Sequence, residues 1–197
     1  MNDLNNISET VDYQIIKESE YHSVSKSSID IRLSKKVSKE KLLAFANSLR
    51  KDRKLFKRLY ITYYLPYMEV GSGAWATTHF SPELEVKILG LTAEEEARMV
   101  NVAKNTSRDV VGIWLGDRPY IGSIVTIYRE NQKLYLESIY KSGSSTTEEM
   151  MEFQSTNGTK LVVKGDPSGA YFMLDTKSRK LQEGGANGIF LEYKKIK

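Results

Sequence analysis

The chain contains no cysteine among its 197 residues and only two histidines, His22 and His79. Without cysteine it can form no disulfide bond, has no thiol nucleophile and cannot build zinc or iron–sulfur sites that depend on thiolate ligands. Two histidines are too few for a histidine-rich metal site. No P-loop, G-x-S-x-G or D-x-D pattern occurs, so the sequence predicts no cofactor, no metal ion and no catalytic motif of these kinds.

Long apolar runs and a strong excess of one charge are absent too. No apolar run approaches the roughly 20 residues of a membrane-spanning helix. The first ten residues, MNDLNNISET, lack the basic and apolar regions of a secretory leader. We therefore expect a cytoplasmic protein from the chain as given, or a secreted or lipid-anchored one if a leader has been removed. The net charge of +4 is mild, so charge alone does not indicate a nucleic-acid partner.

The first half of the chain has the pattern of an α+β domain. Ile29, Ile31 and Leu33 alternate with polar residues, which predicts a half-buried strand. Ser38 is a good N-cap for a helix whose apolar residues follow helical spacing. The segment LEVKIL at 84–89 is a second alternating strand.

Further elements complete this domain. Residues 59–65 are rich in β-branched and aromatic residues and stop at a proline, which predicts a strand. Thr92 and Glu95 form a capping box that opens a second helix. We predict that residues 1–12 are disordered and that residues 13–104 form a sandwich of two helices on a mostly antiparallel sheet.

The second half changes to short strands separated by turn sequences. Apolar segments such as 123–128 and 133–140 flank polar turns at intervals of roughly 8–12 residues, with no helical segment between them. This spacing predicts an all-β domain at residues 110–197, either a curled meander or a small barrel. About 85 residues is short for eight strands of usual length. The domain boundary is expected near residues 104–110.

The sequence Gly-Ile-Trp at 112–114 opens this β-domain. It resembles the Gly-x-Trp with which lipocalin and avidin-like barrels begin, and the resemblance implies a tryptophan that closes the barrel floor. We favour Trp114 as the plug of a small β-domain over a wall of a ligand cup. In the turn that follows, Asp117 and Arg118 are candidate contacts for a ligand at the rim.

The stretch GSGAWATTHF at 71–80 is the main candidate for a binding surface. If it forms a strand, Trp75, Thr77 and His79 share one face, where they could contact a ligand or partner. The alternative is that Trp75 covers the sheet edge and His79 has a structural role. Catalysis by His79, as in a hydrolase or transferase, is a third alternative with less support, because Thr78 points to the opposite face.

A basic segment, RKDRKLFKR, ends the first predicted helix. Cations at a helix C-terminus are stabilised by the helix dipole, but repulsion among six of them favours bound anions. The segment is therefore a candidate phosphate-binding patch, with Tyr60 and Tyr64 on the next strand as stacking partners for bases. Its cations are Arg50, Lys51, Arg53, Lys54, Lys57 and Arg58.

The order of motifs in the first half resembles a family of uncharacterised bacterial and phage proteins. The resemblance rests on SIDIRLSKKVSKEKL followed by LYITYYLPYMEVGSGAWATTHFSPELEVKILGLT. It implies that residues 71–80 are the family's signature and that a small β-domain accompanies the first domain. Several members look like secreted lipoproteins, but this chain lacks a leader and a lipobox cysteine. The resemblance implies no activity.

These observations favour a non-enzymatic protein of two domains that binds a small molecule or another protein. Nucleic-acid binding through the segment 50–58 is the first alternative, and a hydrolase or transferase using His79 is the second. The sequence predicts no cofactor and no membrane span, and it does not predict the oligomeric state.

Overall fold

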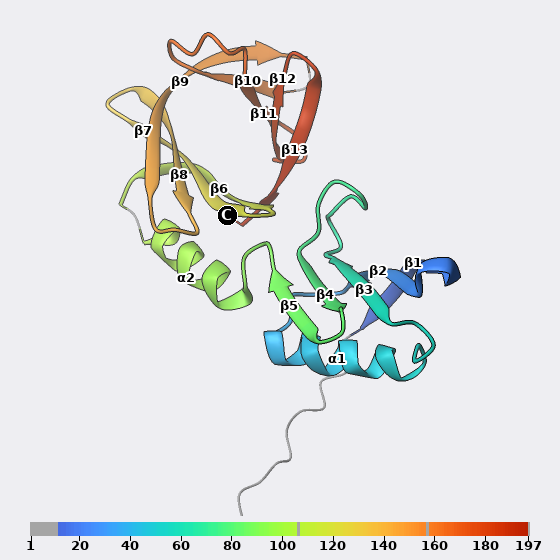
Figure 1. Cartoon of the computed structure of the whole chain (residues 1–197). Helices are drawn as coiled ribbons and strands as arrows, with labels where there is room; N and C mark the ends of the chain where they lie inside the picture. Colours follow the sequence, from blue (N-terminus) through green and yellow to red (C-terminus); the bar gives the residue numbers. More distant parts are fainter. Residues whose placement is uncertain (1–11, 106, 157, 197) are drawn as a thin grey trace, which may run out of the picture. The chain divides into compact units, whose positions relative to one another are not determined.

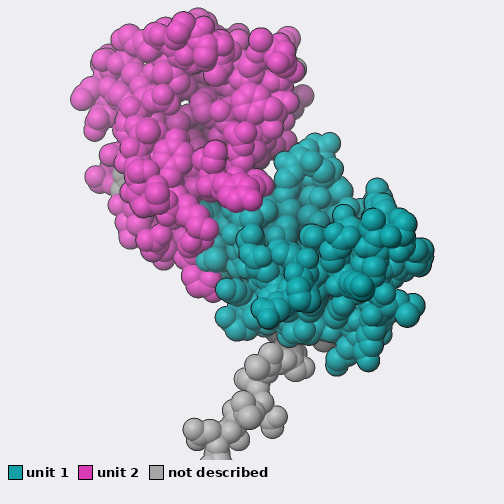
Figure 2. Space-filling model, in the orientation of Figure 1, with its two compact units in different colours: residues 1–93 teal, residues 94–197 magenta. Residues whose placement is uncertain are grey.

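The computed structural model describes residues 12–105, 107–156 and 158–196. The chain forms two compact units, residues 1–93 and 94–197, shown in teal and magenta in Figure 2. The division lies earlier than the boundary expected near 104–110. The predicted disordered segment 1–12 falls outside the described residues except for Asp12, whose carbonyl oxygen accepts a hydrogen bond from Ser34 N at 3.0 Å.

The first unit is a five-stranded sheet with one α-helix, coloured from blue to green in Figure 1. The strand order is β1-β2-β3-β4-β5, and only the pair β2–β3 is parallel. A parallel pair needs a crossover connection, and α1 lies within it. The elements are β1 (Tyr13–Tyr21), a 3-10 helix (His22–Val24), β2 (Lys26–Leu33), α1 (Lys39–Lys51), β3 (Arg58–Tyr64), β4 (Ala76–Phe80) and β5 (Leu84–Ile88).

Helix α1 covers one face of this sheet because its apolar residues follow helical spacing. Leu42, Ala46 and Leu49 are buried and join the core formed with β2 and β3. The predicted N-cap is confirmed, since Ser38 Oγ accepts a hydrogen bond from Lys41 N at 3.3 Å. The opposite face, which we call the open sheet face, carries the half-exposed alternate residues of β2, β3 and β4.

The second unit contains eight strands that close into a barrel, coloured yellow-green to red in Figure 1. The order is β10-β11-β12-β13-β6-β7-β8-β9, with β9 beside β10 and every pair antiparallel. The elements are α2 (Ala93–Lys104), β6 (Asp109–Arg118), β7 (Ile121–Glu130), β8 (Lys133–Tyr140), β9 (Ser145–Ser155), β10 (Gly158–Val163), β11 (Tyr171–Asp175), β12 (Leu181–Gly185) and β13 (Gly188–Lys195).

The α+β class and the predicted barrel are confirmed, but two details differ. Eight strands fit into residues 109–195 because β10 to β12 have only five or six residues each. The segment EGGANG at 183–188 has the composition of a turn, yet β12 extends to Gly185 and only Ala186 and Asn187 form the turn. Helix α2 belongs almost entirely to the second unit, where Glu95 forms an ion pair with Lys141 at 3.2 Å. The predicted sandwich placed both helices on one sheet. The division into units instead groups α2 with the barrel and leaves α1 as the one α-helix among the described residues of the first unit.

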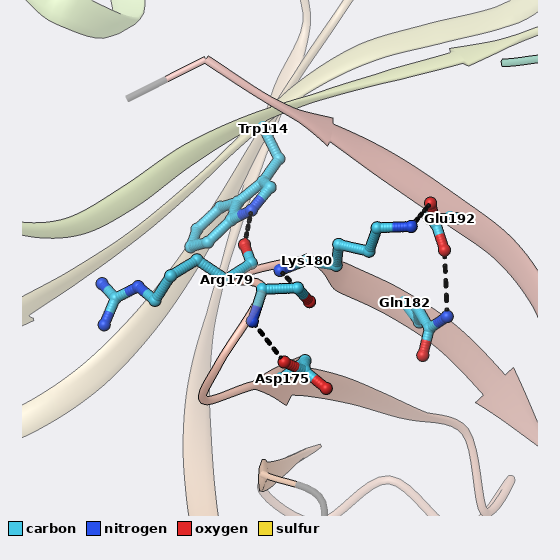
Figure 3. A network of polar contacts seen from close by, with 7 residues as sticks. Trp114, Asp175, Arg179, Lys180, Gln182 and Glu192 are labelled. Atoms are coloured by element: carbon cyan, nitrogen blue, oxygen red, sulfur yellow. Dashed lines mark hydrogen bonds and ion pairs between the residues drawn. The ribbon is translucent and has the colours of Figure 1, made fainter.

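One end of the barrel, which we call the floor, is closed by Trp114. The indole is fully buried, and its Nε1 donates a hydrogen bond to the carbonyl oxygen of Arg179 at 3.0 Å (Figure 3). The Arg179 guanidinium donates in turn to Val111 O at 3.0 Å. Gly112 leaves room for the ring, because a Cβ there would lie 2.7 Å from Trp114 Cζ2. The favoured interpretation, in which Trp114 is buried inside the β-domain, is confirmed.

The turn below the indole is fixed by polar contacts. Asp175 Oδ1 accepts hydrogen bonds from the backbone N of Lys177 at 2.9 Å and of Ser178 at 2.6 Å. These bonds lower the pKa of Asp175, the bond from Ser178 first. At the end of this turn, Lys180 Nζ lies 2.7 Å from Oε1 of Glu192 in β13 (Figure 3). This network holds the floor without using any group at the other end of the barrel.

Candidate functional site

The end of the barrel opposite the floor holds a cavity of about 310 Å³, which we call the mouth cavity. Antiparallel strands alternate in direction, so the ends of β6, β8, β10 and β12 meet the starts of β7, β9, β11 and β13 there. The volume is at the lower limit of the range for small-molecule sites, about 300–1,000 Å³. The lining residues are Gly116, Arg118, Ile121, Ser123, Ser138, Tyr140, Glu148, Val163, Asp166, Ala170, Phe172, Glu183, Leu191 and Tyr193.

The cavity reaches the point where the barrel closes. Strands β13 and β6 pair at only two positions, Lys194 with Leu115 and Lys195 with Trp114, whereas β6 and β7 pair along almost their whole length. Towards the mouth the pairing of β13 with β6 ends. The facing parts of the two strands, including Gly116 and Tyr193, line the cavity. The short seam between β13 and β6 is therefore what allows the space to exist.

A buried tyrosine and a glutamate form one wall of the mouth cavity. Tyr193 OH donates a hydrogen bond to Glu183 Oε2 at 2.7 Å. The phenol ring lies against β6 at a glycine, because a Cβ on Gly116 would come 2.5 Å from Tyr193 Cε1. Burial is the main cause that raises the pKa of Tyr193, and the bond to Glu183 raises it further. The phenol is therefore protonated at neutral pH and holds the carboxylate in place.

The charged groups of the mouth cavity are mainly acidic. Glu148 comes from β9, Asp166 from the loop after β10 and Glu183 from β12, while Arg118 at the end of β6 is the one basic residue of the lining. Asp166 accepts hydrogen bonds from Ser168 Oγ at 2.6 Å and Ser168 N at 2.9 Å, which lower its pKa. Three carboxyl groups and one guanidinium give the cavity a net negative charge at neutral pH.

Among the described residues, burial raises the pKa of three phenols: modestly for Tyr128 and strongly for Tyr63 in the first unit and Tyr193 in the second. Tyr63 OH is also hydrogen-bonded with Thr78 Oγ1 at 2.9 Å. A raised pKa stabilises the fold below the ordinary phenol pKa of about 10, and this stability is lost as the pH rises through the folded-state pKa. In an alkaline titration followed by tyrosinate absorbance, we expect the phenols of Tyr63 and Tyr193 to ionise only when the chain unfolds.

Single substitutions identify the two phenols. Tyr63→Phe and Tyr193→Phe should each remove one tyrosinate from the late step that accompanies unfolding. The control is Tyr120→Phe, at a side chain that is 76% exposed, and it should leave the late step unchanged. Early ionisation of the Tyr193 phenol in the folded protein would contradict the burial of the wall that it forms.

Of the two predicted rim residues, only one reaches the cavity. Arg118 lines the mouth cavity, and its contact with a ligand stays a prediction. Asp117 is buried and does not belong to the lining, because successive residues of β6 face opposite sides of the barrel wall. The prediction of Asp117 as a rim contact is therefore wrong.

The stretch 71–80 does not present Trp75 to solvent. The indole has no exposed surface, belongs to the core of the first unit, and donates from Nε1 to Leu91 O at 2.9 Å. Strand β4 begins only at Ala76, which is buried as well. The alternation of side chains between the two faces of β4, which places Thr77 and His79 on one face, therefore does not extend to residue 75. The prediction that Trp75 shares their surface is wrong.

The other residues of this candidate surface meet on the open sheet face. Tyr60 pairs in register with His79, and their rings are stacked at 5.6 Å between centroids. Thr77 lies half-buried on the same face of β4. His79 Nε2 lies 3.0 Å from Glu85 Oε2. Tyr64 is buried instead, and its hydroxyl accepts a hydrogen bond from Gly71 N at 3.4 Å, so it does not form the predicted stacking surface.

The basic segment 50–58 is divided between structural and exposed cations. Arg53 Nε forms a 2.6 Å ion pair with Glu18 Oε1, which raises the pKa of Arg53. Arg58 Nη2 donates to Val24 O at 2.7 Å, and the guanidinium of Arg50 lies 5.3 Å from the Phe80 ring centre. All three arginines thus have structural contacts. The exposed cations of the segment are Lys51, Lys54 and Lys57.

Sequence reasoning did not find most of the mouth cavity. No sequence motif marks the strands and turns that contain Glu148, Asp166, Glu183 and Tyr193. These residues come together only because the barrel closes. One local signal was available: Gly116 stands two residues after Trp114 within an apolar strand. A glycine inside a strand indicates close approach of another group, here the Tyr193 ring.

Comparisons with family models, curated proteins and solved structures give no match. The resemblance to bacterial and phage proteins therefore stays a prediction. Within the described residues, no group of three or more histidine or carboxylate side chains is placed to hold a metal ion. In the same part of the chain, neither helix is long and apolar enough to cross a membrane.

Proposed function

We propose that the protein binds a small molecule in the mouth cavity of its barrel. The observation that carries this proposal is a cavity of about 310 Å³, lined by both polar and apolar side chains, at one end of a closed barrel. In a ligand site, apolar side chains supply affinity and fixed polar groups supply orientation, and this cavity offers both kinds of side chain.

Two features support a site that is formed before the ligand arrives. The Tyr193–Glu183 hydrogen bond fixes two of its polar side chains at 2.7 Å, so little side-chain entropy is lost on binding. The floor is held independently by Trp114 and Arg179. A rigid floor and a fixed wall favour a binding protein whose cavity keeps its shape.

Ligand-observed NMR with the full chain tests the proposal. The probes are single-ring compounds that are neutral, cationic or anionic, because the cavity volume suits molecules of that size. We expect at least one to bind and to raise the thermal unfolding midpoint as its concentration increases. Ala170→Trp should abolish binding, because Ala170 lines the cavity and a large ring there occupies it.

The control is Ala186→Trp, which makes the same change at an exposed turn outside the cavity. It should bind the probe as the wild-type protein does. If no probe binds, or if Ala170→Trp binds as tightly as the wild type while remaining folded, the proposal fails.

The two alternatives have less support. For nucleic acid, the contacts of Arg50, Arg53 and Arg58 within the fold leave three exposed lysines in the segment. For a hydrolase or transferase, a histidine base needs a nucleophile to activate. His79 instead meets the Tyr60 ring and the Glu85 carboxylate.

A further inference from the structure

We infer that the mouth cavity takes a ligand that carries a positive charge, such as an amine with one aromatic or aliphatic ring. This inference rests on the proposed function, because it names the chemical class of the ligand for the same cavity. It is carried by the placement of carboxylates and aromatic rings around the cavity.

The carboxylates surround the space. Glu148, Asp166 and Glu183 reach it from β9, the β10–β11 loop and β12, so they approach from different elements of the wall. A cation in the cavity is attracted by each of them, whereas an anion is repelled by each. Arg118 at the end of β6 offsets part of this negative charge, but three carboxyl groups against one guanidinium leave the lining with more acidic than basic groups.

Glu183 is the carboxylate best prepared for a cation. Tyr193 OH donates to Oε2 at 2.7 Å, and a carboxylate accepts at both of its oxygens, so Oε1 can accept from an ammonium group. A side chain already held by Tyr193 does not have to be ordered when the ligand binds.

Aromatic rings add to the attraction of a cation. Tyr140, Phe172 and Tyr193 line the cavity, and the rings of Phe172 and Tyr193 have centroids 6.1 Å apart at an interplanar angle of 49°. The faces of such rings attract ammonium groups when these lie within about 6 Å of the ring centre. Apolar neighbours such as Leu191 suit the ring of the ligand.

Three probes of similar size and different charge test the inference with the full chain. They are phenethylamine, 2-phenylethanol and 3-phenylpropionate, titrated at pH 7 and moderate salt by NMR or calorimetry. We expect phenethylamine to bind at least about tenfold more tightly than 3-phenylpropionate. Glu183→Gln should weaken phenethylamine binding about tenfold and 2-phenylethanol binding by less than about twofold, because the amide carries no charge.

The matched control is Glu192→Gln, which removes a carboxylate of the same barrel that pairs with Lys180 and lies outside the cavity lining. It should leave all three affinities unchanged. Tighter binding of 3-phenylpropionate or of 2-phenylethanol than of phenethylamine would overturn the charge class and leave the proposed cavity intact. Failure of all three probes and of the wider set of single-ring compounds would overturn the proposed function as well.

Discussion

Replacing Trp75 with alanine should lower the free energy of unfolding of the first unit by about 3–5 kcal/mol, the usual cost of truncating a buried tryptophan. The indole is fully buried among residues of β2, β3 and α1, and its N–H satisfies the carbonyl oxygen of Leu91. Truncation leaves a large cavity and removes a buried hydrogen bond, and each of these destabilises the fold.

The experiment uses the fact that the chain has two tryptophans, one in the core of each unit. In Trp75→Ala the remaining fluorescence comes from Trp114, so it reports on the barrel alone, while far-UV circular dichroism reports on both units. In a denaturant titration we expect an early loss of dichroism and an unchanged fluorescence midpoint.

The control for this experiment is Thr77→Ala on the half-buried face of β4. It should change the free energy of unfolding by less than about 0.5 kcal/mol, as is usual for partly exposed positions. If Trp75→Ala had an equally small effect, the indole would not be a core residue, and the surface predicted for residues 75–79 would regain its support.

The error at Trp75 shows what period-two alternation can and cannot predict. The strand 28–33 was found correctly because one face of β2 is fully buried and the other is half exposed. Inside β4, Thr77 and His79 were placed on one face correctly for the same reason. Residue 75 precedes the strand, and its orientation depends on hydrogen bonds to distant segments, such as Trp75 N to Tyr63 O at 2.9 Å. A local pattern contains no information about these contacts.

The mouth cavity marks a second limit of the sequence. The short strands in succession and the position of Trp114 follow from local patterns, namely turn spacing and the Gly-x-Trp sequence, whereas the count of eight strands does not, because β10 to β12 have only five or six residues each. The cavity depends instead on how far β13 pairs with β6, two strands whose paired residues Leu115 and Lys194 are 79 positions apart in the chain. The pair formed by Tyr193 and Gly116 is therefore visible only once the barrel has closed.

The floor of the barrel supplies the second prediction with a large effect. Trp114→Ala should lower the free energy of unfolding of the barrel by about 3–5 kcal/mol, because the fully buried ring is lost from its core. Gly112→Ala should cost about 1–3 kcal/mol, because the added Cβ comes within 3.0 Å of the ring and forces it to move. Both values can be measured by chemical denaturation followed by far-UV circular dichroism.

The double variant Gly112→Ala/Trp114→Ala tests whether the cost of Gly112→Ala comes from a clash with the indole or from an effect of alanine on β6 that does not involve the indole. Without the indole, the Cβ at residue 112 meets no ring, so Gly112→Ala should cost less than about 0.5 kcal/mol in the Trp114→Ala background. The two substitutions should therefore be non-additive by about 0.5–3 kcal/mol. Gly185→Ala is the matched control, since its Cβ would lie 3.8 Å from Phe190, and its effect should be small and the same in both backgrounds. Full additivity of Gly112→Ala and Trp114→Ala would mean that the glycine is not there to admit the tryptophan.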